Sequence, residues 1–344
     1  MGDRGAIIPH PLTAGNASAP QVAVLYCGCG ERPGHFAVRR VLAVVSVVLA
    51  LTAIVPAPRP IRTDLSHPGM VLVPAGAFWM GSTEAEVEAA FEAYGGQRYY
   101  YWTEVPRRLI DLPAFWIDRT EVTNAMYLDF VRATGHRAPD DERVWAAPYR
   151  WVAGRPPPGL EAHPATLVSF DDAREFCAWR GMALPTEEQW EKGARGTDGR
   201  SYPWGEGYSP ERLGCADRRS VAPLDREERW LAWWRENYRG RMRGREVGTF
   251  PVGSFPSGMS PYGALDMAGN VFEWVNAIFD PYPGSTHPHP EFGKGYRVVR
   301  GGDWYLGRNY HRAAARLRAP PEHRVPTIGF RCACPRTDDQ HAPI

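Results

Sequence analysis

A histidine surrounded by arginines lies near the carboxyl end of the chain. His311 occurs in the segment RNYHRAAAR, with Arg308, Arg312 and Arg316 close by in sequence. An imidazole titrates near neutral pH and can transfer a proton, and guanidinium groups bind anions. The pattern is therefore compatible with an anionic ligand or with general acid catalysis. The alternative is that His311 lines a pocket and has no chemical role.

Cysteines offer a second kind of chemistry, and the chain has six of them. The spacing of Cys27 and Cys29 does not make a metal site. The remaining cysteines could form disulfides in an oxidising compartment, and they are Cys177, Cys215, Cys332 and Cys334. The sequence leaves open whether Cys215 and Cys334 pair with each other or remain thiols.

Other reactive patterns are weaker. His287 and His289 lie in the segment HPHPE, where the neighbouring prolines favour a surface loop over a metal site. GxSxG, Walker and GxGxxG patterns are absent in any usable context. Forty basic and 39 acidic side chains give a net charge of +1, which creates no field that would concentrate nucleic acid or anionic membrane. Nucleic acid is therefore not an expected partner.

The amino end has the composition of a targeting region. We expect residues 1–35 to be a disordered extension, 36–58 a signal peptide or membrane anchor, and 59–68 a linker. Arg39 and Arg40 precede an apolar run at 41–55 that ends at Pro56. This run would reach about 22 Å as a helix, less than a bilayer core of about 30 Å, which favours a signal peptide over an anchor or a buried core helix. The mature protein is then expected in the periplasm, secreted, or held outside the cytoplasm.

The residues named above must be positioned by a loop-rich fold. The chain has 35 Gly, 33 Pro and 13 Trp, which predicts many turns held together by aromatic burial and excludes a disordered protein. Strands are predicted from Met70 and over the segment RLIDLPAFWID. Four short helices are predicted, each preceded by a side chain that can cap its first turn, at Thr83, Thr123, Ser169 and Thr186.

Residues 223–246 form an apparent insertion rich in arginine and tryptophan. A helical spacing relates four aromatic residues, Trp230, Trp233, Trp234 and Tyr238. The simpler interpretation is a helix packed on the domain. The alternative is an aromatic stripe that contacts a partner or a membrane surface.

A series of segments occurs in an order that is informative as a whole: MVLVPAGAFWMGS, RTEVTNAMYLDFV, HPATLVSFDDAREFCAWRGMALPTEEQWEKGARG, YPWGE, MSPYGALDMAGNVFEWV, RVVRGGDWYLG and IGFRCA. Over residues 69–335 the chain resembles the formylglycine-generating enzyme, or sulfatase-modifying factor, family. The resemblance implies a single α+β domain with little regular secondary structure, similar to C-type lectins. Residues 336–344 would be a tail.

The resemblance also implies where an oxidase centre would lie. Family members that generate formylglycine use two cysteines after the GG motif, which bind copper as thiolates. Those positions are Leu306 and His311 here, and Asp303 replaces a serine. Copper is therefore not expected. Asp303, Tyr305, Leu306 and His311 become candidate residues of a rebuilt cleft.

Two further features rest on the resemblance alone. Cys177 and Cys332 match the positions of a structural disulfide, which would contribute roughly 3 to 5 kcal/mol to stability. A calcium site would use the carboxylates of Asp266 and Glu273 and the main-chain carbonyls of Gly269 and Val271. A tight turn is the alternative there. A second calcium site at Asp217 and Arg218 is harder to place, because the insertion interrupts it.

These observations favour an exported protein that has kept the scaffold and lost the copper centre. We expect a binding or accessory role in an extracytoplasmic pathway, with a peptide, a protein or a small molecule as ligand. The alternative is an enzyme of the same superfamily with a rebuilt site, of the oxidase or maturation type, which includes formylglycine generation from protein cysteine. Membrane contact is expected through the amino-terminal segment.

Overall fold

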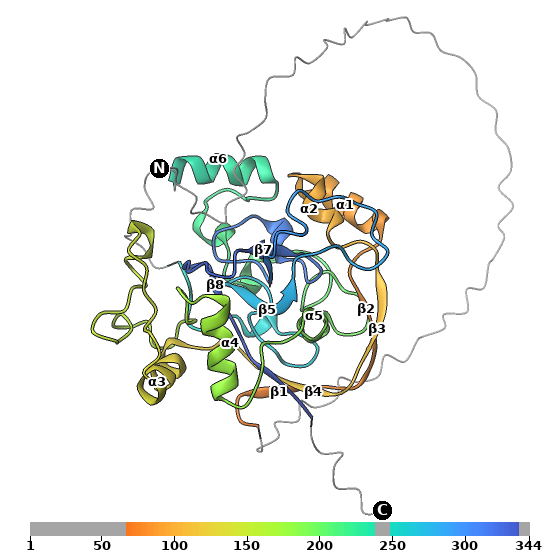
Figure 1. The fold of residues 1–344 in the computed structure, drawn as a ribbon. Helices are drawn as coiled ribbons and strands as arrows, with labels where there is room; N and C mark the ends of the chain where they lie inside the picture. Colours follow the sequence, from red (N-terminus) through yellow and green to blue (C-terminus); the bar gives the residue numbers. More distant parts are fainter. Residues whose placement is uncertain (1–66, 238–247, 337–344) are drawn as a thin grey trace, which may run out of the picture. The chain divides into compact units, whose positions relative to one another are not determined.

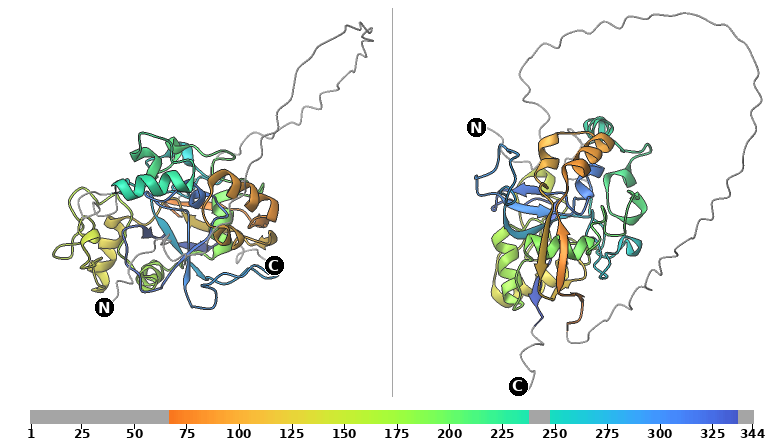
Figure 2. Two further views of the ribbon diagram at one scale, coloured as in Figure 1. Left: turned by 90° about the horizontal axis from the view of Figure 1, so that it is seen from above. Right: turned by 90° about the vertical axis from the view of Figure 1, so that its right-hand side faces the viewer.

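The computed structural model describes residues 67–237 and 248–336, which fall within one compact unit. The apolar run at 41–55 and most of the predicted targeting region lie outside these residues. Short strands and helices alternate with long loops, as Figures 1 and 2 show. The strands are β1 (Met70–Val73), β2 (Gly76–Met80), β3 (Arg108–Leu112), β4 (Phe115–Asp118), β5 (Phe272–Ile278), β6 (Arg297–Arg300), β7 (Leu317–Ala319), β8 (Ile328–Gly329) and β9 (Ala333–Pro335).

The helices begin where the sequence supplies caps. The helices are α1 (Glu84–Tyr94), α2 (Arg98–Trp102), α3 (Asn124–Thr134), α4 (Phe170–Trp179), α5 (Glu187–Arg195) and α6 (Glu227–Asn237), with a 3-10 turn η5 at Arg308–His311. The predicted residues cap four of them, because each side chain accepts a hydrogen bond from the backbone N–H three residues on. Helix α2 and the short 3-10 turns were not anticipated from the sequence.

Three small sheets hold the fold together. One has the order β1-β4-β9, the second is the ribbon β2-β3, and the third has the order β7-β6-β5-β8. In the third sheet β5 runs parallel to β8 and antiparallel to β6. The main apolar core lies between the first and third sheets and α5, and it includes Ile117, Trp190, Met267 and Val298. The architecture is the expected α+β fold with little regular secondary structure.

A disulfide ties the carboxyl end of the domain to α4. The Sγ atoms of Cys177 and Cys332 are 1.98 Å apart and both residues are buried. This is the pairing that the family resemblance implies. Cys215 and Cys334 are both free thiols.

Buried ion pairs cross the core beside α5. Glu187 accepts hydrogen bonds from Arg300 and Arg316, and Glu191 accepts them from Arg195 and Arg300. Burial alone would raise the pKa of Glu187, but Arg316 and Arg300 outweigh it and hold that pKa below its usual value. These arginines serve the scaffold, because their guanidinium groups satisfy buried carboxylates and main-chain carbonyls.

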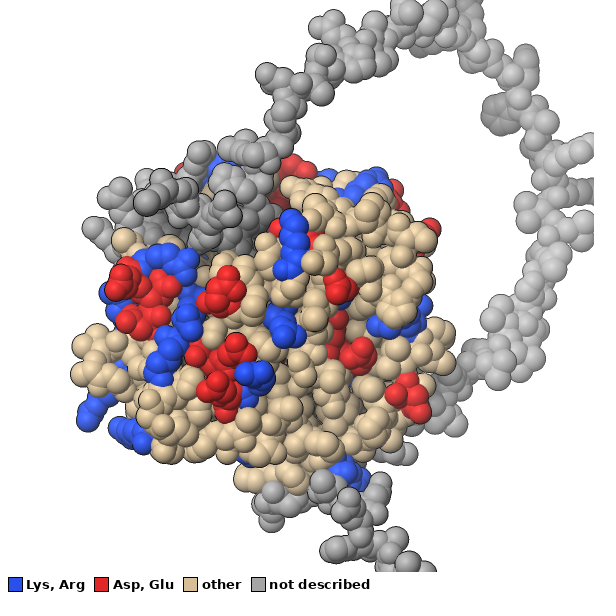
Figure 3. All heavy atoms as spheres, in the orientation of Figure 1, with Lys and Arg blue, Asp and Glu red and all other residues tan. Residues whose placement is uncertain are grey.

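Charge is mixed on the surface that faces the viewer in Figure 3. Acidic and basic side chains lie interspersed there, with uncharged surface between them. This distribution agrees with the nearly balanced charge of the sequence, because no single sign dominates the face.

No helix among the described residues combines the length and the apolar character needed to cross a membrane.

Candidate functional site

The segment from Gly301 to His311 forms a tight loop at the carboxyl end of β6. Gly301 and Gly302 both have positive φ angles, and a Cβ atom on Gly302 would overlap the imidazole of His311. Only glycine fits there. The absence of a side chain at Gly302 therefore allows the imidazole of His311 to pack against the backbone of the turn.

Asp303 holds the loop through its own backbone. Its Oδ1 atom accepts hydrogen bonds from the N–H groups of Tyr305 at 3.0 Å and Leu306 at 2.7 Å. Burial raises the pKa of Asp303 to about 7, even though these two hydrogen bonds favour the charged form. The carboxyl group is turned toward its own loop.

His311 is a buried, neutral imidazole. Its Nε2 atom lies 2.9 Å from the carbonyl oxygen of Asp303, and burial lowers its pKa to about 4. The Nε2–H group therefore donates to that carbonyl, which leaves Nδ1 as an acceptor. Within the described part of the chain, no hydrogen-bond partner reaches Nδ1. A buried acceptor without a donor costs free energy and marks a position where a ligand or water would be stabilised.

The arginines near His311 are paired with carboxylates of the domain, so they are not free to form the anion site that the sequence left open. Arg308 donates to Asp217, Arg312 to Glu104 and Arg316 to Glu187. Each guanidinium is held by a carboxylate from a distant segment, because burial makes an unpaired charge costly. This pairing was invisible in the sequence, since the acidic partners are about 90 to 210 residues away.

The four predicted cleft residues lie together, but they are enclosed. Asp303, Tyr305, Leu306 and His311 are each no more than 5% exposed. The insertion contributes to this closure. The indole N–H of Trp230 on α6 donates to the carbonyl oxygen of Tyr305 at 2.7 Å, and Trp230 itself is fully buried. The simpler interpretation of the insertion, a helix packed on the domain, therefore describes the Trp230 side of α6.

Two more contacts lie next to the loop at 301–311. A Cβ atom on Gly248 would overlap the ring of Trp304, so only glycine allows this segment of chain to cross the indole. The hydroxyl oxygen of Tyr149 accepts hydrogen bonds from the N–H groups of Gly248 and Thr249. The roles of Tyr149 and Gly248 were missed from the sequence, which gives no signal for contacts over such separations.

Of the two free thiols, Cys215 lies near the loop, because it contacts Tyr208, whose ring centre is 6.1 Å from that of His311. Leu306 and His311 carry no sulfur, Cys215 is buried, and Cys334 lies on β9 opposite Trp116 of β4. Burial raises the pKa of Cys215, which keeps it a thiol rather than the thiolate that copper requires.

The expected calcium ligands are held by the protein itself. Both Glu273 oxygens accept hydrogen bonds from Arg331, and Oε2 also accepts one from Trp190. Asp266 Oδ2 accepts one from Gly253. Among the described residues, no group of three or more His, Cys, Asp or Glu side chains is placed to hold a metal.

Glu121 adds a third buried carboxyl to this region. Burial and the neighbouring Asp266 raise its pKa well above the usual value, and burial likewise raises the pKa of Asp266. The Oε2 atom of Glu121 is buried without a hydrogen-bond partner in the described part of the chain. At the second calcium site considered from the sequence, Asp217 pairs with Arg308 at 2.6 Å.

Comparison with known proteins identifies the family. The model of the sulfatase-modifying factor enzyme 1-like domain matches residues 57–335. The chain belongs to this family. A formylglycine-generating enzyme of Streptomyces coelicolor is 33% identical over 323 residues, covering 80% of this chain and 92% of that protein.

Relatives within the family differ in the activity that their names give. A mouse protein named inactive C-alpha-formylglycine-generating enzyme 2 is 28% identical and covers 79% of this chain and 88% of its own length. The solved structure of PvdO from Pseudomonas aeruginosa is 26% identical, has a TM-score of 0.54, and covers 77% of this chain and 93% of that one. Membership of the family therefore establishes the fold and leaves the activity to the site.

Proposed function

We propose that this protein is a sulfatase-modifying factor-like domain that acts by binding, as an accessory in an extracytoplasmic pathway, and does not generate formylglycine. The observation that carries the proposal is the combination of Leu306 and His311, two side chains without sulfur, in an enclosed loop. Copper oxidase chemistry needs soft thiolate ligands and access for the substrate. The similarity to a mouse relative named inactive supports the same conclusion.

The test is a direct assay of cysteine oxidation. The purified chain is incubated with a CxPxR peptide, copper and oxygen, and aldehyde is measured by mass spectrometry. We expect no aldehyde above the protein-free control, whereas the Streptomyces coelicolor enzyme serves as the positive control. Turnover comparable to that enzyme would refute the proposal.

A second candidate is an enzyme with a rebuilt site, and two observations favour it. Asp303 has its pKa raised to about 7 and His311 has an unpartnered Nδ1 atom among the described residues, and perturbed groups of this kind concentrate at active sites. A hercynine oxygenase of Mycolicibacterium smegmatis is 30% identical and covers 76% of this chain, which spans 60% of that protein. Stoichiometric copper or iron after purification, lost in His311→Ala, would favour the enzyme over the binding protein.

Calcium remains part of the proposal because three buried carboxyl groups lie close together there. Glu121, Asp266 and Glu273 are buried around the single guanidinium of Arg331. A hard cation with oxygen ligands would bind these groups, provided that Arg331 releases Glu273. Melting temperature with calcium and with a chelator tests the idea. A rise with calcium that Asp266→Asn abolishes supports it, and identical curves contradict it.

Export is proposed from the amino-terminal sequence. Cell fractionation of the full chain in a Gram-negative host is expected to place it outside the cytoplasm. Replacing the apolar run at 41–55 with a polar linker would then retain it inside. Recovery of the unaltered full chain from the cytoplasm would contradict export.

A further inference from the structure

A cavity of about 270 Å³ lies between α1 and the loop at 199–207. The polar part of its wall includes the side chains of Arg195 and Arg312. The apolar part is contributed by Ala89, Ala90, Ala93 and Ala314. The volume is below the range of pockets that hold drug-sized ligands, about 300 to 1,000 Å³, so an occupant would have the size of one side chain.

The buried ion-pair network behind this wall has more guanidinium groups than carboxylates. Each of its carboxylates accepts from at least one guanidinium, yet there are four buried guanidiniums and three buried carboxylates. The network consists of Arg195, Arg300, Arg312, Arg316, Glu104, Glu187 and Glu191. A buried charge without a counter-charge is costly, so an anion bound at the wall would stabilise the network.

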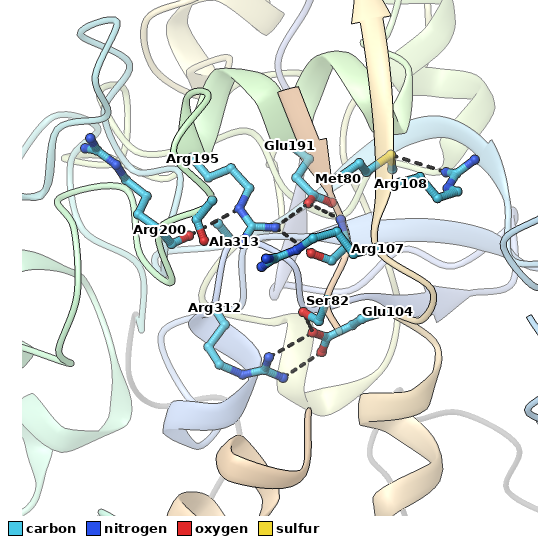
Figure 4. A network of polar contacts seen from close by, with 12 residues as sticks. Met80, Ser82, Glu104, Arg107, Arg108, Glu191, Arg195, Arg200, Arg312 and Ala313 are labelled. Carbon is cyan, nitrogen blue, oxygen red and sulfur yellow. Dashed lines mark hydrogen bonds and ion pairs between the residues drawn. The ribbon is translucent and has the colours of Figure 1, made fainter. Parts of the chain in front are cut away.

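Arg312 retains one donor for such an anion. Its two terminal nitrogens donate to the Glu104 carboxylate at 2.8 and 2.6 Å, as Figure 4 shows. Its Nε–H group is buried and has no hydrogen-bond partner in the described part of the chain. A buried donor without an acceptor costs free energy, which the binding of an acceptor would recover. Arg195, in contrast, donates through all three of its nitrogens to oxygens of the protein, so it contributes mainly charge.

Two tyrosine hydroxyls in the same wall supply a second donor. The hydroxyl oxygens of Tyr94 and Tyr202 lie 2.8 Å apart, so one donates to the other and one O–H group of the pair remains for a further acceptor. Burial raises the pKa of Tyr202 well above its usual value, and Arg312 acts on that pKa in the opposite direction. The phenol therefore stays protonated, and the guanidinium of Arg312 lies near it.

The carboxylates that line the cavity already have partners. Glu86 on α1 pairs with Arg107 at 2.6 Å. Glu206 accepts hydrogen bonds from the N–H and hydroxyl groups of Ser201 and also interacts with Arg200. Both carboxylates are exposed, so water and salt screen their charge. The buried side of the wall, by contrast, presents positive charge and donors to an occupant.

We propose that this cavity binds a small carboxylate, with its alkyl part along the alanines and its oxygens at the Nε–H of Arg312 and the tyrosine hydroxyls. An ionised carboxylate has acceptors and no donor, which matches these groups. Its source is either a free short-chain acid or a glutamate side chain of a partner peptide. The site is not the one that the segment around His311 suggested, because His311 does not line this cavity. It does not depend on the function proposed above.

The test uses the purified full-length chain and two probes, butyrate and Nα-acetyl-glutamate α-methylamide, titrated by NMR or calorimetry. We expect saturable binding of at least one probe. The corresponding amides, butyramide and Nα-acetyl-glutamine α-methylamide, have nearly the same shape and no charge, and they should bind at least tenfold more weakly. Tighter binding of butyrate would assign a free acid as the source, and tighter binding of the glutamate probe a partner side chain. Absence of saturable binding by both probes, or equal binding of acid and amide, would overturn the proposal.

Matched variants locate the binding without breaking the pair between Arg312 and Glu104. Ala93→Leu fills part of the cavity and should weaken the bound probe at least tenfold. Ala85→Leu should not, because Ala85 is also exposed on α1 but does not line the cavity. Glu206→Gln removes a negative charge, so it should bind the probe at least as tightly as the wild type. Circular dichroism melting checks that each variant is folded. Equal binding by wild type and Ala93→Leu, or weaker binding by Glu206→Gln, would contradict the proposal.

Discussion

The ion-pair core beside α5 and the loop at 301–311 are both buried, but they treat polar atoms differently. In the core, Glu187 and Glu191 each meet two guanidinium groups. In the loop, no cationic side chain of the described segments pairs with Asp303, and His311 keeps an unpartnered Nδ1 atom. In the core, every carboxylate is paired, although the Nε atom of Arg300 has no hydrogen-bond partner among the described residues. The two regions therefore differ in the charge that faces their buried carboxyl groups, which is cationic in the core and absent among the described residues at Asp303.

The largest expected effect comes from removing one arginine of the ion-pair core beside α5. Arg300→Ala leaves two buried carboxylates with one guanidinium partner each, so we expect a loss of about 4 kcal/mol in the free energy of unfolding. Urea denaturation measures it. Arg98→Ala, which removes an exposed pair with Glu88, should cost less than about 1 kcal/mol. Equal effects of the two changes would mean that burial does not distinguish these ion pairs.

Removing the disulfide is a second test of how the domain is stabilised. Replacing Cys177 and Cys332 together with serine should lower the free energy of unfolding by about 3 kcal/mol, because the unfolded chain loses a long closed loop. Intact mass after alkylation, with and without reduction, should show both sulfurs protected in the wild type. Alkylation of either cysteine in the unreduced folded protein would contradict the pairing.

The contacts that bury the loop at 301–311 can be weakened by a substitution outside the loop. Trp230→Ala removes the indole that covers Tyr305, so α6 should open about 2 kcal/mol more easily. Hydrogen exchange should show faster exchange of the α6 amides, with α5 amides unchanged as an internal control. Uniform acceleration across the domain would show that α6 belongs to the global folding unit instead.

The smallest effect concerns pH. Burial, followed by the neighbouring Glu228, raises the pKa of Glu227 to about 7, and Tyr101 and Tyr310 are the other titratable groups that interact with it. The folded state therefore holds a proton that the unfolded state has lost, and this stability is present below about pH 4.5 and disappears as the pH rises through 7. Asp303 acts in the same direction, and His311, with a lowered pKa, opposes it.

Glu227→Gln isolates this contribution. The variant should lose about 1 kcal/mol of the rise in stability between pH 7.5 and pH 5, measured by urea denaturation at each pH. An exposed carboxylate on the same helix provides the control, because Glu236→Gln should leave the slope nearly unchanged. A wild-type slope in Glu227→Gln would show that this carboxyl stays ionised.

The sequence predicted the local structure of the fold better than the long-range contacts that hold it together. Caps at Thr83, Thr123, Ser169 and Thr186 are local signals, since each acts on an N–H group three residues away. The family resemblance supplied the topology and the disulfide. The four candidate cleft residues lie close together because they belong to one short segment.

Long-range pairing was the part that the sequence could not supply. The segment around His311 suggested an anion site because its arginines are visible and their partners Glu104, Glu187 and Asp217 are far away in the chain. The cavity beside α1 was equally hidden, because its lining comes from segments more than a hundred residues apart. A cluster of arginines in one segment suggests unpaired positive charge. In the folded core, those arginines are paired with carboxylates from distant segments.

The position of β9 has a consequence for how the protein is made. This last strand completes the sheet that begins with β1, so Ile117 near the start of the domain pairs with Ala333 near its end. A nascent chain still lacking residues beyond 332 would carry β4 with one edge uncovered, and unpaired edges invite association with other chains. The domain therefore reaches its native sheet only after synthesis has passed its final strand, which favours a chaperone or an export factor that keeps the early strands apart until then.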